Sequence, residues 1–230
     1  MTESVAANVA RVMARIHEAA LRARRHPNEI RLVAVSKTIP VSSILEAVGA
    51  GVSALGENYL QEALPKIKAV DVHVQWHFIG HLQSNKAHLA VKLFDMIHSV
   101  DSFKLAQEIS RRALAEGKVI DVLIQVNVSG EQSKFGIQPD MLKLLLEQAS
   151  ALEGIQVKGL MTMPPFFNQP ELCRPCFRKL RDLARSMREI GIPRVKMDEL
   201  SMGMSGDFEV AIEEGANLVR VGTAIFGARS

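Results

Sequence analysis

The sequence predicts a single-domain (β/α)8 barrel, the TIM-barrel fold, with one extra helix before the first strand. Short apolar, β-branched runs alternate along the chain with segments whose apolar residues recur at helical spacing. Eight strand–helix units can be counted, and 230 residues shared among eight units leave about 29 residues each, close to the ~30 residues of a strand–helix–strand unit. We therefore expect one domain over residues 1–230.

The chain opens on an amphipathic helix and then enters the first strand–helix unit. Apolar residues within Val5–Ala20 recur on one helical face, and the helix must stop before Pro27. The run Arg31–Lys37 is short, apolar and β-branched, as expected of a strand. Pro40 marks the first turn of the next helix, and Gly49 lies near its end.

The later units repeat this order. Further strands are expected at 52–56, 74–79, 96–100, 119–128, 156–161, 199–202 and 218–221. Helices are expected at 59–70, 84–93, 102–116, 139–152 and 175–190, with a short helix at 207–214 and a turn at 222–227. Strands that are each followed by a helix favour a parallel sheet, which closes into a barrel when there are eight of them.

A doubly wound sheet also alternates strands and helices, and the glycines between Gly49 and Gly56 resemble a dinucleotide-binding fingerprint. In that fingerprint the glycines open a helix directly after a strand. Here Gly49 and Gly51 close a helix instead, and the chain contains no G-x-x-x-x-G-K-[ST] phosphate loop. The barrel is therefore favoured.

Composition limits the partners and the compartment. The formal net charge of +3 is too small to indicate nucleic-acid binding, and the chain has no run of ~18 apolar residues that would cross a membrane. The Arg-rich opening helix has the amphipathic character of a mitochondrial transit peptide, but it contains Glu18, which favours a structural helix. The chain has two cysteines, too few for a disulfide framework. We expect a cytoplasmic protein.

Lys37 is the first candidate for chemistry. It shares a strand face with Val33 and Val35, so alternation that points those valines into the barrel brings the ammonium group to the barrel mouth. Partial burial would lower the lysine pKa and favour the neutral amine that attacks an aldehyde. The functional interpretation is a Schiff-base lysine; the alternative is a strand-end lysine that extends into solvent.

The loops after the last two strands predict a phosphate site. The segment Ser201–Gly206 carries small residues into the short helix at 207–214, where free backbone N–H groups meet the positive end of a helix dipole. After the eighth strand, Gly222 and Thr223 add a close backbone approach and a hydroxyl, and Ser205 can reach the same anion. The alternative is that Ser205 only caps its helix and Gly222 only turns the chain.

Arg220 completes the predicted site. It shares a strand face with Leu218 and Gly222 and is expected to point inward beside Lys37, where a buried guanidinium needs an acceptor. Pyridoxal 5′-phosphate (PLP) carries the phosphate, the aldehyde and the ring nitrogen that these three parts of the site would bind. An arginine facing the ring nitrogen keeps it unprotonated, which makes the ring a weaker electron sink than the acidic partner common in PLP enzymes.

Six segments in the same order resemble the YggS/PROSC family, the pyridoxal phosphate homeostasis proteins, which are similar to the N-terminal barrel of alanine racemase. The segments are Leu32–Thr38, Gly56–Glu62, Trp76–Lys86, Gly159–Met163, Leu200–Ser205 and Val219–Gly227. The resemblance covers nearly the whole chain. It departs at Ile39, where many members carry a basic residue.

The resemblance implies a cofactor site and a role. It implies that Lys37 forms the PLP aldimine, that Arg220 faces the ring nitrogen, and that the phosphate lies near Met204, Ser205, Gly222 and Thr223. It also implies that Asn58 lines the pocket, with Ser201 a weaker candidate. The family has no established reaction, so the implied role is PLP and amino-acid homeostasis without catalytic residues. Apo PLP-dependent enzymes are possible recipients of the cofactor.

Two enzymatic alternatives are weaker. A PLP-dependent racemase needs a second acid–base group, often a tyrosine from an additional domain, and we expect no additional domain after the eighth strand. Tyr59, the only tyrosine, is interpreted as a helix-packing aromatic. A PLP-independent lyase would need a carboxylate base near Lys37, and Glu57 is expected to point away from the pocket if Asn58 points in. The absence of a dimerising domain favours a monomer.

The remaining motifs predict no metal site. Cys173 and Cys176 have redox-motif spacing but precede a helix rather than end a strand, and a structural zinc site usually has four ligands. His73, His77 and His81 recur at every fourth residue, but in a predicted strand and loop, so a structural or pocket-lining role is expected.

Overall fold

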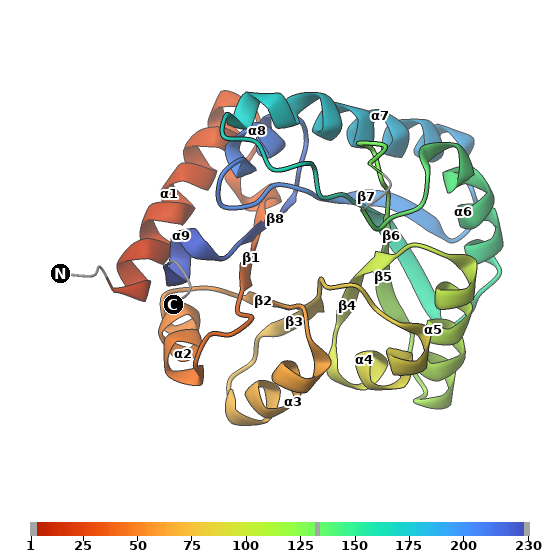
Figure 1. The fold of residues 1–230 in the computed structure, drawn as a ribbon, viewed down its shortest axis with the longest axis horizontal. Helices are drawn as coiled ribbons and strands as arrows, with labels where there is room; N and C mark the ends of the chain where they lie inside the picture. Colours follow the sequence, from red (N-terminus) through yellow and green to blue (C-terminus); the bar gives the residue numbers. More distant parts are fainter. Residues whose placement is uncertain (1–3, 132–133, 228–230) are drawn as a thin grey trace.

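Eight parallel strands close into a barrel in chain order, as the sequence predicted (Figure 1). The structure is a computed structural model that describes residues 4–131 and 134–227. The strands are β1 (Arg31–Val35), β2 (Ala54–Glu57), β3 (Gln75–Phe78), β4 (Met96–Val100), β5 (Ile120–Gln125), β6 (Ile155–Met161), β7 (Val195–Ser201) and β8 (Leu218–Val221). Strand β8 pairs with β1 and completes the ring.

Helices surround the barrel. They are α1 (Val5–Arg22), α2 (Val41–Gly49), α3 (Leu60–Ala69), α4 (Ala87–Leu93), α5 (Phe103–Ala115), α6 (Leu142–Ser150), α7 (Arg174–Ile190), α8 (Phe208–Glu213) and α9 (Thr223–Phe226). Short 3₁₀ turns lie at Pro27–Glu29, Ser84–Lys86, Pro139–Met141 and Pro170–Cys173. The extra helix α1 packs against α8 and α9, so the first and last helices lie side by side (Figure 1).

Strand β7 shows the largest departure from the predicted elements. It begins at Val195, four residues before the expected start at 199. The pairing register between β6 and β7 shifts within this stretch, so that Val157 pairs with Val195 and Gly159 with Glu199. A Cβ atom on Gly159 would lie 1.9 Å from the carbonyl oxygen of Glu199. Because this close contact and the register shift depend on a distant strand, the pattern of apolar residues in the sequence of β7 does not reveal where the strand begins.

The described residues form two apolar clusters, one between the barrel and its helices and one inside the barrel. The inner cluster takes one residue from each of six strands: Val33, Ala54, Met96, Leu123, Met161 and Leu218. Its inward-facing Val33 fixes the orientation of β1, because residues two apart in a strand share a face. Val35 and Lys37 are therefore directed towards the barrel mouth.

No helix among the described residues is long and apolar enough to span a bilayer.

Candidate functional site

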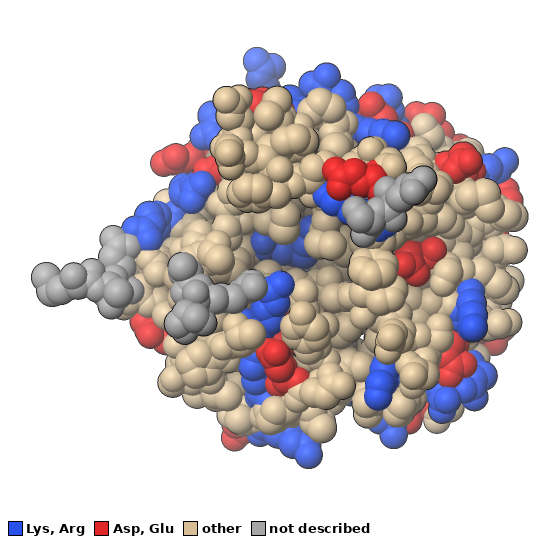
Figure 2. All heavy atoms as spheres, in the orientation of Figure 1, with Lys and Arg blue, Asp and Glu red and all other residues tan. Residues whose placement is uncertain are grey.

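A cavity of about 280 Å³ lies at the carboxyl ends of β1, β6, β7 and β8, near the lower end of the ~300–1,000 Å³ typical of small-molecule sites. Six of the eight predicted site residues line it: Lys37, Met204, Ser205, Arg220, Gly222 and Thr223. Figure 2 shows a hollow near the middle of the molecule's face, with basic side chains in it. The loops after β1, β7 and β8 thus meet where the sequence predicted.

Lys37 lies just beyond the end of β1 and is half-buried. A tight turn follows it, in which the N–H of Ile39 donates to the carbonyl oxygen of Ser36 at 3.0 Å. Thr38, in the middle of this turn, has a left-handed backbone with φ of 64°. Val35 and Lys37 both line the cavity, so the alternation along β1 brings the amine to the mouth as expected.

The loop between β7 and α8 depends on a glycine. Gly203 has φ of +90°, and a Cβ atom there would lie 2.6 Å from the Cβ of Ala211. The backbone N–H of Met204 donates to Asp207 Oδ1 at 2.6 Å, which closes the loop. The sequence allows this compact turn because glycine alone fits both the backbone angle and the space.

Ser205 joins the loops after β7 and β8. Its Oγ accepts hydrogen bonds from the backbone N–H groups of Gly222 at 3.2 Å and Ala224 at 3.3 Å. One oxygen atom is thus held by two amide donors at the edge of the cavity. This arrangement can hold an anion, because the oxygen of a phosphate accepts from the same kind of donor.

Arg220 forms part of the cavity floor and is only 3% exposed. Its Nη2 donates to the carbonyl oxygen of Thr162 at 2.9 Å, and its Nη1 donates to Ser201 Oγ. Burial lowers the pKa of Arg220 to about 10, so the guanidinium remains charged at neutral pH. A permanent cation held by neutral partners is well placed to meet an acceptor on a ligand.

Ser201 continues into two histidines inside the barrel. Its Oγ lies 2.9 Å from His98 Nδ1, and His98 Nε2 lies 3.0 Å from His77 Nδ1. Arg220 donates to Ser201, whose hydroxyl can in turn donate to His98 Nδ1 or accept from it, and the second His98 nitrogen shares a hydrogen bond with His77. We call Arg220, Ser201, His98 and His77 the inner polar chain.

Burial determines which members of the inner polar chain are charged. It lowers the pKa of His77 to about 4 and that of His98 well below the ordinary value. Both imidazoles are therefore neutral at pH 7, and Arg220 carries the only charge within the inner polar chain. His77 has the structural role expected of it. His98 was not singled out from the sequence, although it lies two residues after the inward-facing Met96 in the same strand, which puts it on the inward face.

The structure separates Asn58 and Ser201 from the other six predicted residues. Ser201 lies beneath the cavity, hydrogen-bonded to Arg220. Asn58 lines a second cavity of about 290 Å³ together with Tyr59, His81 and Phe135. In the described part of the chain, its buried Oδ1 accepts no hydrogen bond. The rings of His81 and Phe135 stack over this cavity with centroids 3.9 Å apart.

Two side chains weighed for acid–base roles lie elsewhere. Glu57 does not line either cavity and accepts hydrogen bonds from Ser36 Oγ at 2.7 Å and Lys66 Nζ at 2.8 Å. Tyr59, expected to pack against a helix, is instead 55% exposed at the second cavity. Its place at the N-cap of α3 leaves the ring outside the packed face of that helix.

The cysteines and histidines form no ligand set. Burial raises the pKa of Cys173 to about 12, and also raises that of Cys176, which disfavours the reactive thiolate. Within residues 4–131 and 134–227, no group of three His, Cys, Asp or Glu side chains is arranged to hold a metal ion.

Comparisons with known proteins identify the family of this chain. The family model of the alanine racemase N-terminal domain matches residues 4–230. A pyridoxal phosphate homeostasis protein of Aquifex aeolicus is 48% identical over 223 residues, 96% of each chain. Its namesake in Pseudomonas aeruginosa is 44% identical over 227 residues, 98% of this chain and 96% of that protein.

A solved structure gives the same result. PipY of Synechococcus elongatus, determined with PLP bound, matches with a TM-score of 0.82 and 38% identity, over 92% of this chain and 100% of its own. Sequence and structure therefore agree over nearly the full length of the relatives. The chain belongs to the alanine racemase N-terminal domain family and, within it, to the pyridoxal phosphate homeostasis proteins.

Proposed function

We propose that this protein binds PLP covalently through Lys37 in the 280 Å³ cavity and takes part in intracellular PLP and amino-acid homeostasis without catalysing a reaction. The observation that carries the proposal is that this one cavity joins an amine, a buried guanidinium and a backbone anion cradle. Each is matched to a different part of PLP. The names of the relatives and the PLP-bound PipY structure support the same cofactor.

The residues present fit the cofactor at three points. The Gly222 and Ala224 N–H groups, which already hold one oxygen atom of Ser205, would hold the phosphate together with the Thr223 hydroxyl. Arg220 would face the ring nitrogen, because a guanidinium can donate but never accept a hydrogen bond. Lys37 would bond the aldehyde carbon. Asn58 and Ser201 would act from beside and beneath the cavity.

The same residues support binding rather than catalysis. When bound, PLP supplies an electrophilic aldehyde and a ring that can accept electrons. Facing the ring nitrogen, Arg220 would keep it unprotonated and so would weaken the second property while leaving the first intact. Glu57, the carboxylate nearest to Asn58 in sequence, is turned towards Lys66 and away from the cavity. We infer that the site holds PLP as cargo.

Borohydride trapping tests the covalent site. The purified protein should absorb visible light, and reduction should add the mass of PLP to Lys37. Lys37→Ala should abolish trapping, whereas Lys92→Ala, at an exposed lysine paired with Glu116, should not change it. Trapping of equal yield in Lys37→Ala would show that the assignment is wrong.

Proton exchange in deuterated water separates a binding protein from an enzyme. Each amino acid is incubated with the loaded protein, and its α-proton is followed by NMR. We expect no exchange beyond that caused by an equal amount of free PLP. Faster exchange or loss of optical activity would instead support the racemase alternative.

We further propose that the protein works in the cytoplasm as a monomer and passes PLP to apo PLP-dependent enzymes. Reactivation of such an enzyme should be faster with the loaded protein than with the same amount of free PLP. Equal rates would argue against direct transfer.

A further inference from the structure

The two peptide groups on either side of Lys37 are held by charged side chains from helix α3. Lys66 Nζ, on α3, donates to the carbonyl oxygen of Ser36 at 2.6 Å. The backbone N–H of Thr38 donates to Glu62 Oε2 at 2.8 Å. Each bond involves a full charge, and charge-assisted hydrogen bonds are about twice as strong as neutral ones.

These side chains also hold one another. Lys66 Nζ lies 2.8 Å from Glu57 Oε1 and 3.6 Å from Glu62 Oε2. The Ser36 hydroxyl donates to the same Glu57 oxygen at 2.7 Å. The Glu57 side chain is fully buried and that of Lys66 is 10% exposed. We call Glu57, Glu62 and Lys66 the clamp.

The clamp acts on both backbone dihedrals of Lys37. The Ser36 carbonyl belongs to the peptide plane before the Lys37 Cα, and the Thr38 N–H belongs to the plane after it. Because each peptide is planar, only φ and ψ at Lys37 can turn one plane relative to the other. Holding both planes therefore fixes the direction in which the Lys37 side chain leaves the backbone.

The neighbouring backbone shows that this segment is held against its preference. Thr38 has φ of 64°, in the left-handed region that is unfavourable for a β-branched residue. Residues in that region persist when their surroundings hold them there, and they gather at functional sites. The Glu62 bond to the Thr38 N–H is such a restraint.

Stability alone does not account for the clamp. A buried ion pair often contributes less to folding than apolar residues of the same volume would, because its charges lose their water. None of the three clamp residues lines the 280 Å³ cavity, so none is placed to touch a ligand there. Glu62 and Lys66 bond the backbone that carries Lys37, and Glu57 holds Lys66 and the Ser36 hydroxyl in place.

We propose that Glu57, Glu62 and Lys66 are positioning residues that aim the Lys37 amine at the cavity. This inference rests on the proposed function. It predicts that the clamp governs how well Lys37 bonds an aldehyde, while the phosphate and ring contacts, made by β7, β8 and their loops, do not depend on it.

Two ligands separate these contributions in the full-length protein. PLP bonds Lys37, whereas pyridoxine 5′-phosphate has the same phosphate and ring but an alcohol in place of the aldehyde. We expect Lys66→Met to weaken PLP binding about tenfold, the effect of one lost charge-assisted hydrogen bond. Pyridoxine 5′-phosphate binding should stay within about twofold of the wild type. Lys68→Met, at an exposed position of the same helix, is the matched control.

A second variant tests the proposal if Lys66→Met does not fold. Glu62 is 34% exposed on its side chain, so Glu62→Ala should fold. It should weaken PLP binding less, about threefold, and leave pyridoxine 5′-phosphate unchanged, because it removes the Thr38 bond and the longer 3.6 Å contact with Lys66 but keeps the Lys66 bond to Ser36. In the ligand-free protein, the Thr38 amide proton should move upfield in the NMR spectrum of Glu62→Ala and stay in place in Lys68→Met.

The outcomes are distinct. Equal weakening of both ligands would show that the clamp is merely structural, and unchanged PLP binding in Glu62→Ala would show that it does not position Lys37. If borohydride reduction traps no PLP on Lys37 of the wild-type protein, the proposed function fails. The chemical shift of the Thr38 amide proton still reports on the clamp itself in that case.

Discussion

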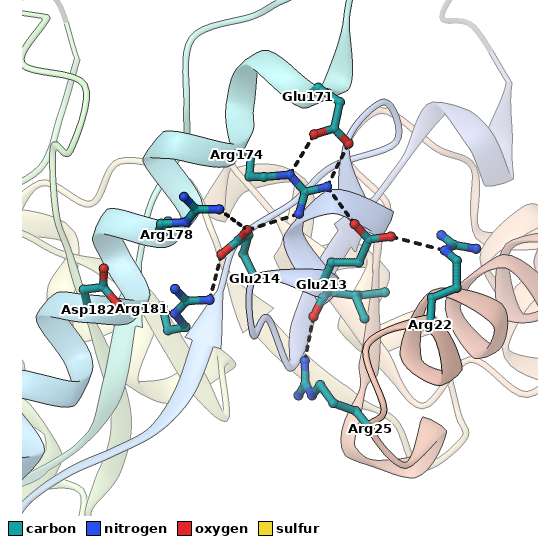
Figure 3. Close-up of polar contacts among 10 residues, drawn as sticks. Arg22, Arg25, Glu171, Arg174, Arg178, Arg181, Asp182, Glu213 and Glu214 are labelled. Carbon is teal, nitrogen blue, oxygen red and sulfur yellow. Dashed lines mark hydrogen bonds and ion pairs between the residues drawn. The ribbon is translucent and has the colours of Figure 1, made fainter.

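Two polar clusters in this barrel give their arginines different kinds of hydrogen-bond partner: a carboxylate in one and neutral groups in the other. Between α7 and α8, Glu214 accepts hydrogen bonds from three arginines (Figure 3): Arg174 at 3.1 Å, Arg178 at 3.2 Å and Arg181 at 2.7 Å. We call these four residues the outer ionic cluster; the adjacent Glu213 extends it to Arg22 of α1 at 3.2 Å. In the inner polar chain, Arg220 bonds only a carbonyl oxygen and a hydroxyl.

The difference follows from how much water reaches each arginine and from what its charge does in the fold. The arginines of the outer ionic cluster are 25% to 57% exposed on their side chains, so their charges remain partly solvated while they join helices to one another. Arg220 lies inside the barrel, where a carboxylate partner would neutralise it. Neutral partners position the guanidinium and leave its charge for a ligand. The outer ionic cluster thus joins helices to one another, whereas the inner polar chain holds Arg220 at the cavity.

Acidification should separate the clusters most strongly. The pKa of His77 is about 4 in the fold against 6.5 ordinarily, so the unfolded chain binds more protons between these values. The free energy of unfolding should therefore fall by about 3 kcal/mol from this histidine as the pH drops from 6.5 to 4. His98 acts in the same direction. Urea unfolding across this pH range measures the effect.

His77→Gln is the matched variant, because its side-chain amide does not titrate and can still hydrogen-bond His98. It should remove the His77 contribution to the pH dependence between 6.5 and 4 and leave that of His98. The arginines hold the pKa of Glu214 below its usual 4.5, so that carboxylate loses its contribution only below pH 4.5. An unchanged slope in His77→Gln would contradict the neutral state assigned to the inner chain.

Removing the central hydroxyl of the inner chain should have the next largest effect. Ser201→Ala leaves Arg220 Nη1 and His98 Nδ1 without the oxygen that joins them. Unsatisfied buried polar groups should lower the free energy of unfolding by about 1–3 kcal/mol. Ser186→Ala removes an exposed hydroxyl bonded within α7 and should change it by less than about 0.5 kcal/mol. Equal losses in chemical denaturation would refute the distinction.

The outer ionic cluster should give the smallest effect. Arg181→Ala leaves Glu214 with Arg174 and Arg178, so we expect a loss below about 1 kcal/mol. This loss should shrink in 1 M NaCl, where the Debye length is ~3 Å. The loss caused by Ser201→Ala should not respond to salt. A salt-independent cost for Arg181→Ala would mean that its charge is more buried than its exposure indicates.

Much of the site was predictable because it follows from local rules. Alternation along β1 is enough to align Lys37 with the inward-facing Val33. Loop order is enough to bring Ser205 beside Gly222, since the carboxyl ends of neighbouring parallel strands meet at one edge. These relations span a few residues or one strand neighbour.

Contacts between distant strands were not predictable. The partnership of Ser201 with His98 joins residues 103 apart in sequence. The early start of β7 depends on how Gly159 meets Glu199 across the sheet. Asn58 was expected beside the cofactor, but the loops from β3 and β5 form a second cavity around it. Neither periodicity nor spacing encodes these neighbours.

By itself, the sequence determined the barrel, the face on which Lys37 lies and the loops that form the cradle, because strand period, helix period and chain order are local properties. Only the tertiary structure decided which buried groups share hydrogen bonds. It closed β8 onto β1, placed His98 beside Ser201 and set Lys66, held by Glu57, against the backbone before Lys37. Desolvation then determined the charges, because the cost of a charge depends on how completely packing excludes water.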